Sequence, residues 1–213
     1  MKIAILLFDR FTALDAVGPY EVLVRIPGAE VTFVAKARGE VRTDTGRFGL
    51  IADAALSELT DPDIVVVPGG PGQTQAMADD EILDWLRAVD ATSKWTTSVC
   101  TGSIVLAAAG LLDGKKATTH WIAYDELEKL GVEPTPERVV FQGKYVTAAG
   151  VSSGIDMALA LVAEELGDFV AQAIQLGIEY DPQPPFDAGA PGKAPAEVEG
   201  FLRENSRFLK EGA

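Results

Sequence analysis

The sequence predicts an α/β fold in which a mostly parallel sheet is covered by helices on both faces. Two observations lead to this prediction. The apolar runs are short, nearly continuous and rich in Val and Ile, as in strands that are buried on both sides. Helical segments alternate with these runs along the chain, which is the order that parallel strands and their crossover connections require.

The expected elements follow one another from the N-terminus. The apolar runs predict strands at residues 2–8, 30–36, 63–67, 95–99 and 145–148, with a weaker one near 116–119. Between them, helices are predicted at 16–25, 80–91, 102–110, 121–130 and 154–165. Residues 40–53 alternate in polarity and contain two glycines, which indicates a hairpin beside the sheet. A second short hairpin is predicted over 138–147, with its turn at Gln142 and Gly143.

Composition narrows the class of protein. The chain has 213 residues, is 47% hydrophobic and shows no linker, so we expect one domain with an ample core. Its 18 basic and 32 acidic residues give a net charge of −14, which disfavours nucleic acids and anionic membranes as partners. The apolar run at 3–8 is too short for a membrane span and lacks the basic region of a secretory signal. Together with the single cysteine, this predicts a cytoplasmic protein.

Chemically distinctive segments follow four of the predicted strands. Asp15 comes after the first strand, the glycine-rich residues 68–72 follow the strand at 63–67, Cys100 follows the strand at 95–99, and residues 148–154 follow the last one. Ligands of open parallel sheets bind beyond the carboxyl ends of the strands. The topology therefore gathers an acid, two glycine-rich loops and a thiol at one edge of the sheet.

Cys100 is the only cysteine, so it forms no intramolecular disulfide and serves either packing or reactivity. It stands between a β-branched segment and a helix-forming run, as a nucleophile on a strand-to-helix turn does. The positive end of the helix dipole should lower the pKa of a thiol there. A small buried hydrophobe is the alternative interpretation, and the neighbouring segments at the sheet edge favour the nucleophile.

Asp15 has two interpretations. It caps the following helix, or its carboxyl group exchanges a proton with the thiol. In the second case the nearby thiolate should raise the pKa of Asp15, so that the carboxyl group acts as a general acid. Thr101, directly after the thiol, either caps the next helix or donates a proton to a bound intermediate.

The remaining candidates are a glycine pair and a histidine. Gly69 and Gly70 present backbone amides that stabilise charge developing on a substrate atom, unless they merely form a tight turn. His120, the only histidine, pairs with Cys100, caps the helix at 121–130, or fills a polar position in the core. One histidine and one cysteine cannot form a structural zinc site, so we expect no metal.

The composition changes from about residue 180, where prolines and glycines alternate with aromatic side chains. This pattern predicts an extended arm followed by a terminal helix at about 195–209. Tyr180 and Phe186 provide apolar surface to bury, so the arm either docks on a dimer partner or remains a loose tail.

Several motifs resemble the ThiJ/PfpI superfamily and, within it, the isonitrile hydratases. The likeness extends over nearly the whole chain, and the segments that carry it are Ser98-Val99-Cys100-Thr101-Gly102-Ser103, Thr118-Thr119-His120-Trp121, Leu14-Asp15 with Gly18-Pro19, Pro68-Gly69-Gly70, Gly150 with Ser153-Gly154, and Pro184-Pro185-Phe186. Transcription regulators that fuse such a domain to a DNA-binding region share the first two motifs, but a single predicted domain leaves no DNA-binding half.

The resemblance implies a flavodoxin-like, class I glutamine-amidotransferase-like three-layer sandwich that forms a homodimer. It implies that Cys100 is a nucleophile on a tight elbow, that Asp15 is its carboxyl partner and that Thr101 is a polar contact. It also implies that Gly150 lines the substrate pocket, and we expect Val151, Gly69 and Gly70 to contact the substrate there as well. Thr101 stands where protease-like members carry histidine, which disfavours peptidase activity. An aspartate in place of the glutamate of deglycase-like members favours the hydratase branch.

The implied reaction is the cofactor-independent conversion of an isonitrile and water to an N-substituted formamide. Cys100 would form a covalent thioimidate, Asp15 would act as general acid and base, and His120 would have a supporting role. Two alternatives remain at this stage. One is glyoxalase or deglycase activity on small dicarbonyls, and the other is a non-enzymatic regulator in which Cys100 oxidises to a sulfinic acid.

Overall fold

The computed structural model describes residues 1–206, and a sheet of seven strands runs through their centre. Its strands lie in the order β10-β11-β7-β6-β1-β2-β5, and all neighbours are parallel except the β10–β11 hairpin. The bounds are β1 Lys2–Leu6, β2 Glu30–Ala35, β5 Ala54–Ala55, β6 Ile64–Val67, β7 Trp95–Val99, β10 Val139–Gln142 and β11 Tyr145–Ala148. The predicted strands at the centre of the sheet are therefore confirmed, and each ends within a residue or two of its expected limit.

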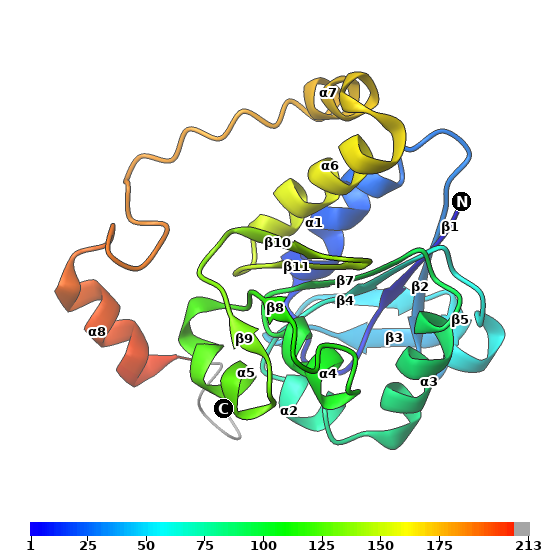
Figure 1. Ribbon diagram of the computed structural model, residues 1–213, viewed down its shortest axis with the longest axis horizontal. Helices are drawn as coiled ribbons and strands as arrows, with labels where there is room; N and C mark the ends of the chain where they lie inside the picture. Colours follow the sequence, from blue (N-terminus) through cyan, green and yellow to red (C-terminus); the bar gives the residue numbers. More distant parts are fainter. Residues whose placement is uncertain (207–213) are drawn as a thin grey trace.

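Helices cover the sheet on both faces, which makes three layers (Figure 1). On one face lie α1 Ala13–Leu23 and α6 Ser153–Leu166, and α7 Asp168–Gly177 packs against α6. On the other lie α2 Gln73–Ala76, α3 Asp80–Asp90, α4 Gly102–Ala108 and α5 Tyr124–Lys129. Because both faces are covered, the central strands are buried over most of their length; β6, with the sequence Ile-Val-Val-Val, has every residue in the core. The expected α/β class is confirmed.

Short elements complete the fold. The predicted side hairpin is formed by β3 Gly39–Arg42 and β4 Gly49–Ala52, which pair antiparallel outside the main sheet. The second hairpin, β10–β11, turns at Gly143, whose φ of 62° is the left-handed conformation that such a tight turn requires. The predicted strand near 116–119 is shorter, β8 Lys116–Ala117, and pairs with β9 Glu133–Pro134. The segments η1 Leu56–Glu58 and η2 Trp121–Ala123 are 3₁₀ turns, so the helix predicted at 121–130 is divided between η2 and α5.

The sequence did not predict α2, α7, β5 or β9. α7 is amphipathic, but only Ala171 and Ile174 are buried on it, while Phe169 and Leu176 are 85% and 80% exposed. Its apolar residues therefore do not mark the core face as clearly as those of the central elements do.

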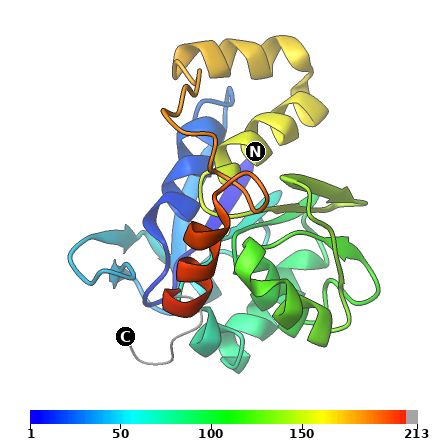
Figure 2. The same ribbon diagram turned by 90° about the vertical axis from the view of Figure 1, so that its left-hand side faces the viewer.

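After α7 the chain forms the expected extended arm, and it ends in α8 Ala196–Asn205 (Figures 1 and 2). Residues 181–192 of the arm are exposed, and no residue of α8 is buried. The predicted terminal helix at 195–209 is confirmed as far as residue 205, and its last part lies outside the described residues. Within residues 1–206, no helix is long and apolar enough to cross a membrane.

Candidate active site

Cys100 occupies a strained turn between β7 and α4. Its φ of 57° is in the left-handed region, which residues other than glycine rarely adopt. Hydrogen bonds hold this conformation: the Cys100 N–H donates to the carbonyls of Ala148 (3.1 Å) and Ala149 (2.9 Å), and the Thr119 hydroxyl donates to the Cys100 carbonyl at 3.0 Å. The predicted strand, turn and helix around the thiol are therefore present, and two neighbouring segments fix the turn.

The glycine pair after β6 lies directly against this turn. A Cβ atom at Gly69 would lie 2.4 Å from the Thr101 nitrogen and 3.0 Å from the Cys100 Cβ, so only glycine fits. Gly70 has a φ of 134°, which also favours glycine. The segments that follow β6 and β7 are thus packed against each other at the edge of the sheet, as predicted.

Asp15 reaches the thiol from the first turn of α1. The side chain is fully buried, its Oδ2 accepts a hydrogen bond from the Gly69 N–H at 2.9 Å, and its carboxyl group hydrogen-bonds with Cys100. Thr12, not Asp15, occupies the cap position of α1. The helix-cap interpretation of Asp15 is therefore wrong, because the side chain turns away from its own helix toward the glycine loop and the sulfur.

The surroundings of Cys100 raise the pKa of its thiol well above the ordinary value of 9.0. Burial is the largest cause, because it penalises the thiolate, and the Asp15 charge is the second. The backbone amides of Val151 and Thr101 approach the sulfur and act in the opposite direction. The expectation of a lowered pKa is wrong for this structure, because complete burial beside a carboxylate outweighs the helix dipole.

Thr101 links the turn to the glycine loop. Its Oγ1 accepts a hydrogen bond from the Gly70 N–H at 3.0 Å, and it makes no side-chain cap for α4. The amides of both glycines are therefore engaged within the protein, Gly69 with Asp15 and Gly70 with Thr101. The amides directed at the sulfur instead come from Thr101 and Val151. Val151, with a φ of 27°, could not have been identified as such a donor from its residue type.

His120 lies next to this site and caps η2, one of the three roles considered for it. Its Nδ1 accepts a hydrogen bond from the Ile122 N–H at 3.3 Å, so the ring proton of the neutral imidazole is on Nε2. A Cβ atom at Gly150 would lie 2.8 Å from the His120 Cδ2, which explains why glycine occupies that position. The structure thus brings together His120, Gly150 and Val151 along one surface.

That surface belongs to a cavity of about 490 Å³. The loop Ala149–Val151, whose carbonyl and amide groups contact Cys100, forms part of its wall. The complete lining is His120, Trp121, Tyr124, Pro136, Glu137, Arg138, Ala149, Gly150, Val151, Ser152, Gly189, Ala190 and Pro191. The sequence did not predict that Trp121, Tyr124 and the three arm residues line this cavity. The position of Trp121 next to the single histidine could have indicated that it belongs to the site.

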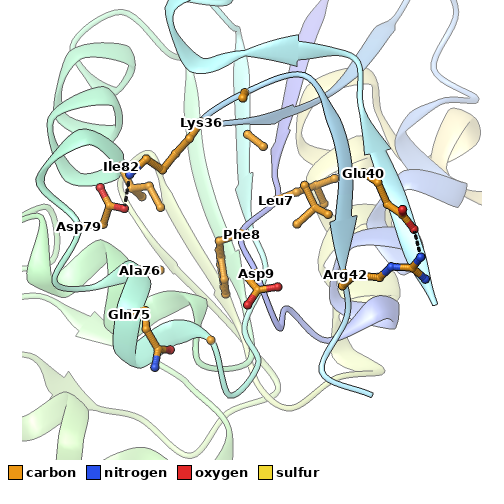
Figure 3. A pocket seen from close by; sticks show the side chains of 14 residues that line it. Leu7, Phe8, Asp9, Lys36, Glu40, Arg42, Gln75, Ala76, Asp79 and Ile82 are labelled. Carbon is orange, nitrogen blue, oxygen red and sulfur yellow. Dashed lines mark hydrogen bonds and ion pairs between the residues drawn. The ribbon is translucent and has the colours of Figure 1, made fainter. Parts of the chain in front are cut away.

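A second cavity, of about 390 Å³, lies beyond the carboxyl ends of β1 and β2. Figure 3 shows Leu7 and Phe8 within it and two ion pairs at its margin, Lys36 with Asp79 and Arg42 with Glu40. None of the site residues predicted from the sequence lines it. Among residues 1–206, no group of three or more His, Cys, Asp or Glu side chains could hold a metal ion.

The chain belongs to the DJ-1/PfpI family, whose model matches residues 1–164. The family resemblance and the flavodoxin-like fold expected from it are confirmed. Isonitrile hydratase from Pseudomonas putida is 44% identical over 206 residues, which is 97% of this chain and 90% of that protein.

Two other relatives place the chain within the family. The crystal structure of a ThiJ/PfpI family protein from Pseudomonas syringae superposes with a TM-score of 0.92 and 40% identity, covering 95% of this chain and 84% of that one. A deglycase from Pyrococcus horikoshii is 28% identical over 152 residues, 70% of this chain and 89% of its own length.

Proposed function

We propose that this protein is an isonitrile hydratase, which converts an isonitrile R–NC and water to the formamide R–NH–CHO without a cofactor. The observation that carries the proposal is the buried pair of Cys100 and Asp15, in which a nucleophile and a proton carrier are in contact. Its support from relatives is the 44% identity to the Pseudomonas putida enzyme over nearly the whole chain.

The first step adds the thiol across the isonitrile carbon. The Cys100 proton passes to the Asp15 carboxylate as the sulfur attacks the terminal carbon, and Asp15 then delivers it to that carbon. A C–S and a C–H bond form, the S–H bond breaks, and the product is the thioimidate R–N=CH–S–Cys100. Because the pKa of the thiol is raised, the sulfur holds its proton before the reaction begins. The Asp15 carboxylate beside it takes up this proton as the sulfur attacks.

In the second step water attacks the thioimidate carbon. Asp15, ionised again, accepts a proton from the water and passes it to the nitrogen, which gives R–NH–CH(OH)–S–Cys100. The C–S bond then breaks, the hydroxyl proton returns to sulfur through Asp15, and the formamide leaves. The amides of Thr101 and Val151 stabilise the sulfur when it carries negative charge, as donors do in an oxyanion hole.

The other predicted site residues orient the reacting groups or line the substrate cavity. Gly69 and Gly70 orient Asp15 and Thr101 through their N–H groups. Gly150 and Val151 line the substrate cavity, and His120 holds the shape of its wall. We propose these roles together with those of Cys100, Asp15 and Thr101.

A direct test is to incubate the protein with a para-substituted phenyl isonitrile and to measure the formamide. The Cys100→Ala variant should fold and produce none, because it has no atom to form the thioimidate. Turnover at the wild-type rate by this variant would rule out the covalent scheme. Lactate from methylglyoxal would instead indicate the glyoxalase alternative, and peroxide-dependent sulfinic acid without turnover would indicate a redox regulator.

We also propose that residues 1–213 form a single domain that acts as a homodimer in the cytoplasm. Apolar side chains gather outside the core on α7 and the arm, where Phe169, Leu176 and Phe186 are 85%, 80% and 77% exposed. Surfaces of this kind are typical of subunit contacts. A cytoplasmic location would keep the thiol of Cys100 reduced.

A further inference from the structure

One wall of the cavity of about 490 Å³ comes from the C-terminal arm. Gly189, Ala190 and Pro191 line it together with the loop Ala149–Val151, although about forty positions separate the two segments in the sequence. The arm leaves the body of the molecule after α7 and returns beside α5 (Figure 1). Its central part therefore lies over a cavity whose wall includes the loop Ala149–Val151, which contacts Cys100.

Contacts at both ends hold the arm in this position. At its start, the Tyr180 hydroxyl donates to the Asp156 carboxylate on α6 at 3.1 Å. Beyond its end, the guanidinium of Arg203 on α8 lies 4.8 Å from the ring centre of Trp121, a cation–π contact with a residue of the cavity. Residues 181–192 between these anchors are exposed, so the anchors determine where the middle of the arm lies.

The residues of the lining are suited to an uncharged aromatic ligand. The rings of Trp121 and His120 stack with their centroids 5.8 Å apart and form an aromatic wall, and Pro191 adds an apolar surface. Arg138 and Glu137 also line the cavity, but the Arg138 Nε donates to the Asp156 carboxylate at 2.8 Å, and Glu137 is exposed to solvent, so neither places a buried, uncompensated charge against the ligand. A volume of about 490 Å³ lies in the range of small-molecule sites, about 300–1,000 Å³, and is far more than a methyl group fills.

We propose that arm residues 189–191 determine which isonitriles the enzyme accepts, by closing the cavity around an uncharged aromatic group. This inference rests on the proposed function, because it assigns the organic group of the isonitrile to the cavity next to Cys100. The arm is then a specificity-determining element, and Ala190, which lies between a glycine and a proline, is the position where a larger side chain can be introduced.

The test compares two substitutions on the arm. Ala190→Trp places a large side chain in the cavity, and Ala188→Trp places the same side chain two residues away at an exposed position that does not line it. We expect Ala190→Trp to lower kcat/KM for phenyl isonitrile by about tenfold or more, with methyl isonitrile changed by less than about twofold. Ala188→Trp should leave both substrates unchanged.

A second variant probes the anchor. Arg203→Gln removes the cation–π contact with Trp121 from an exposed helix without adding bulk. It should raise KM for phenyl isonitrile and leave kcat for methyl isonitrile unchanged. The proposal is overturned if Ala190→Trp affects both substrates equally or neither, or if Ala188→Trp causes the same loss.

A binding measurement separates this inference from the proposed reaction. N-phenylformamide is stable, and calorimetric titration reports its binding whether or not the protein turns over isonitriles. Binding that Ala190→Trp weakens about tenfold and Ala188→Trp leaves intact supports the arm as a wall of the cavity, even if no isonitrile is hydrated. Turnover of phenyl isonitrile that is insensitive to residue 190 would instead leave the hydratase proposal standing and overturn the role of the arm.

Discussion

Replacing Asp15 with asparagine separates the charge of this residue from its shape. The carboxylate accepts a hydrogen bond from the Gly69 N–H at 2.9 Å in a fully buried position. The asparagine carbonyl can accept the same bond, so the glycine loop keeps its partner. Because a hydrogen bond to a charged group contributes about 1 kcal/mol more than a neutral one, Asp15→Asn should change the free energy of unfolding by only about that amount.

The same substitution should lower the pKa of Cys100. The Asp15 charge is the second cause that raises this pKa, and its removal leaves burial as the main one. The thiol of Asp15→Asn should therefore be more acidic than in the wild type but remain above its ordinary pKa, since burial still penalises the thiolate.

The rate of catalysis should fall, although the thiol becomes more acidic. An amide can neither deliver a proton to the isonitrile carbon nor accept one from water, so general acid–base catalysis is lost. That loss corresponds to about 10²–10⁴-fold in rate, or about 3–5 kcal/mol of transition-state stabilisation. Asp15→Asn thus combines a more acidic thiol with a much slower enzyme.

Three measurements decide the outcome. Formamide production reports turnover, the pH dependence of iodoacetamide alkylation reports the Cys100 pKa, and circular dichroism reports folding. Glu21→Gln is the matched control, because Glu21 lies on the same helix with its side chain 49% exposed, and it should change none of the three. A variant at Asp15 that keeps full turnover would refute the acid–base role, and a thiol pKa that rises would refute the electrostatic account.

Two further predictions concern the thiol and the glycine loop. Above pH 9.0 the unfolded chain loses the Cys100 proton before the folded protein does, so the free energy of unfolding should fall by at most about 1.4 kcal/mol per pH unit. Tyr145, whose pKa is raised from 10.0 to about 12, lowers the free energy of unfolding in the same way, but only above pH 10. Urea unfolding between pH 9 and 10 should show this slope in the wild type and lose it in Cys100→Ser, and an equal slope in both would contradict the assignment. Gly69→Ala should cost about 1–3 kcal/mol and reduce turnover more than tenfold, because its Cβ would lie 2.4 Å from the Thr101 nitrogen. Gly200→Ala on α8, which has no neighbour within 4 Å, is the control, and equal losses in both would show that the tight packing at Gly69 is not the cause.

Much of the fold could be predicted from the sequence because its signals are local. β1 and β6 are almost wholly buried and are identified by their apolar residues, whereas β7, Trp95–Val99, is identified by its β-branched residues and not by hydrophobicity. Gly143 indicates the β10–β11 turn, because glycine readily adopts the left-handed conformation that this turn has. α7 gave no such signal, since its apolar residues Phe169 and Leu176 face outward.

The sequence predicted that several candidate residues lie close together, but not how they interact. The ends of parallel strands meet at one edge, so the gathering of Asp15, Gly69 and Cys100 followed from topology. The pKa of the thiol did not, because it depends on how completely the site is closed and on how near the carboxylate lies. The donor at Val151 was equally hidden, since a backbone N–H is the same in almost every residue.

The sequence by itself determined the layered α/β fold, the thiol on its strand-to-helix turn and the carboxyl group that lies beside it. These follow from hydrophobic periodicity, from one cysteine at a strand-to-helix junction, and from motifs shared with the family. Only the tertiary structure decided that burial raises the thiol pKa, that the glycine amides hold Asp15 and Thr101, and that arm residues 189–191 line one cavity with the loop that contacts Cys100. The physical reason is that desolvation, hydrogen bonding and cavity shape depend on distances between residues far apart in the chain, which local sequence patterns do not encode.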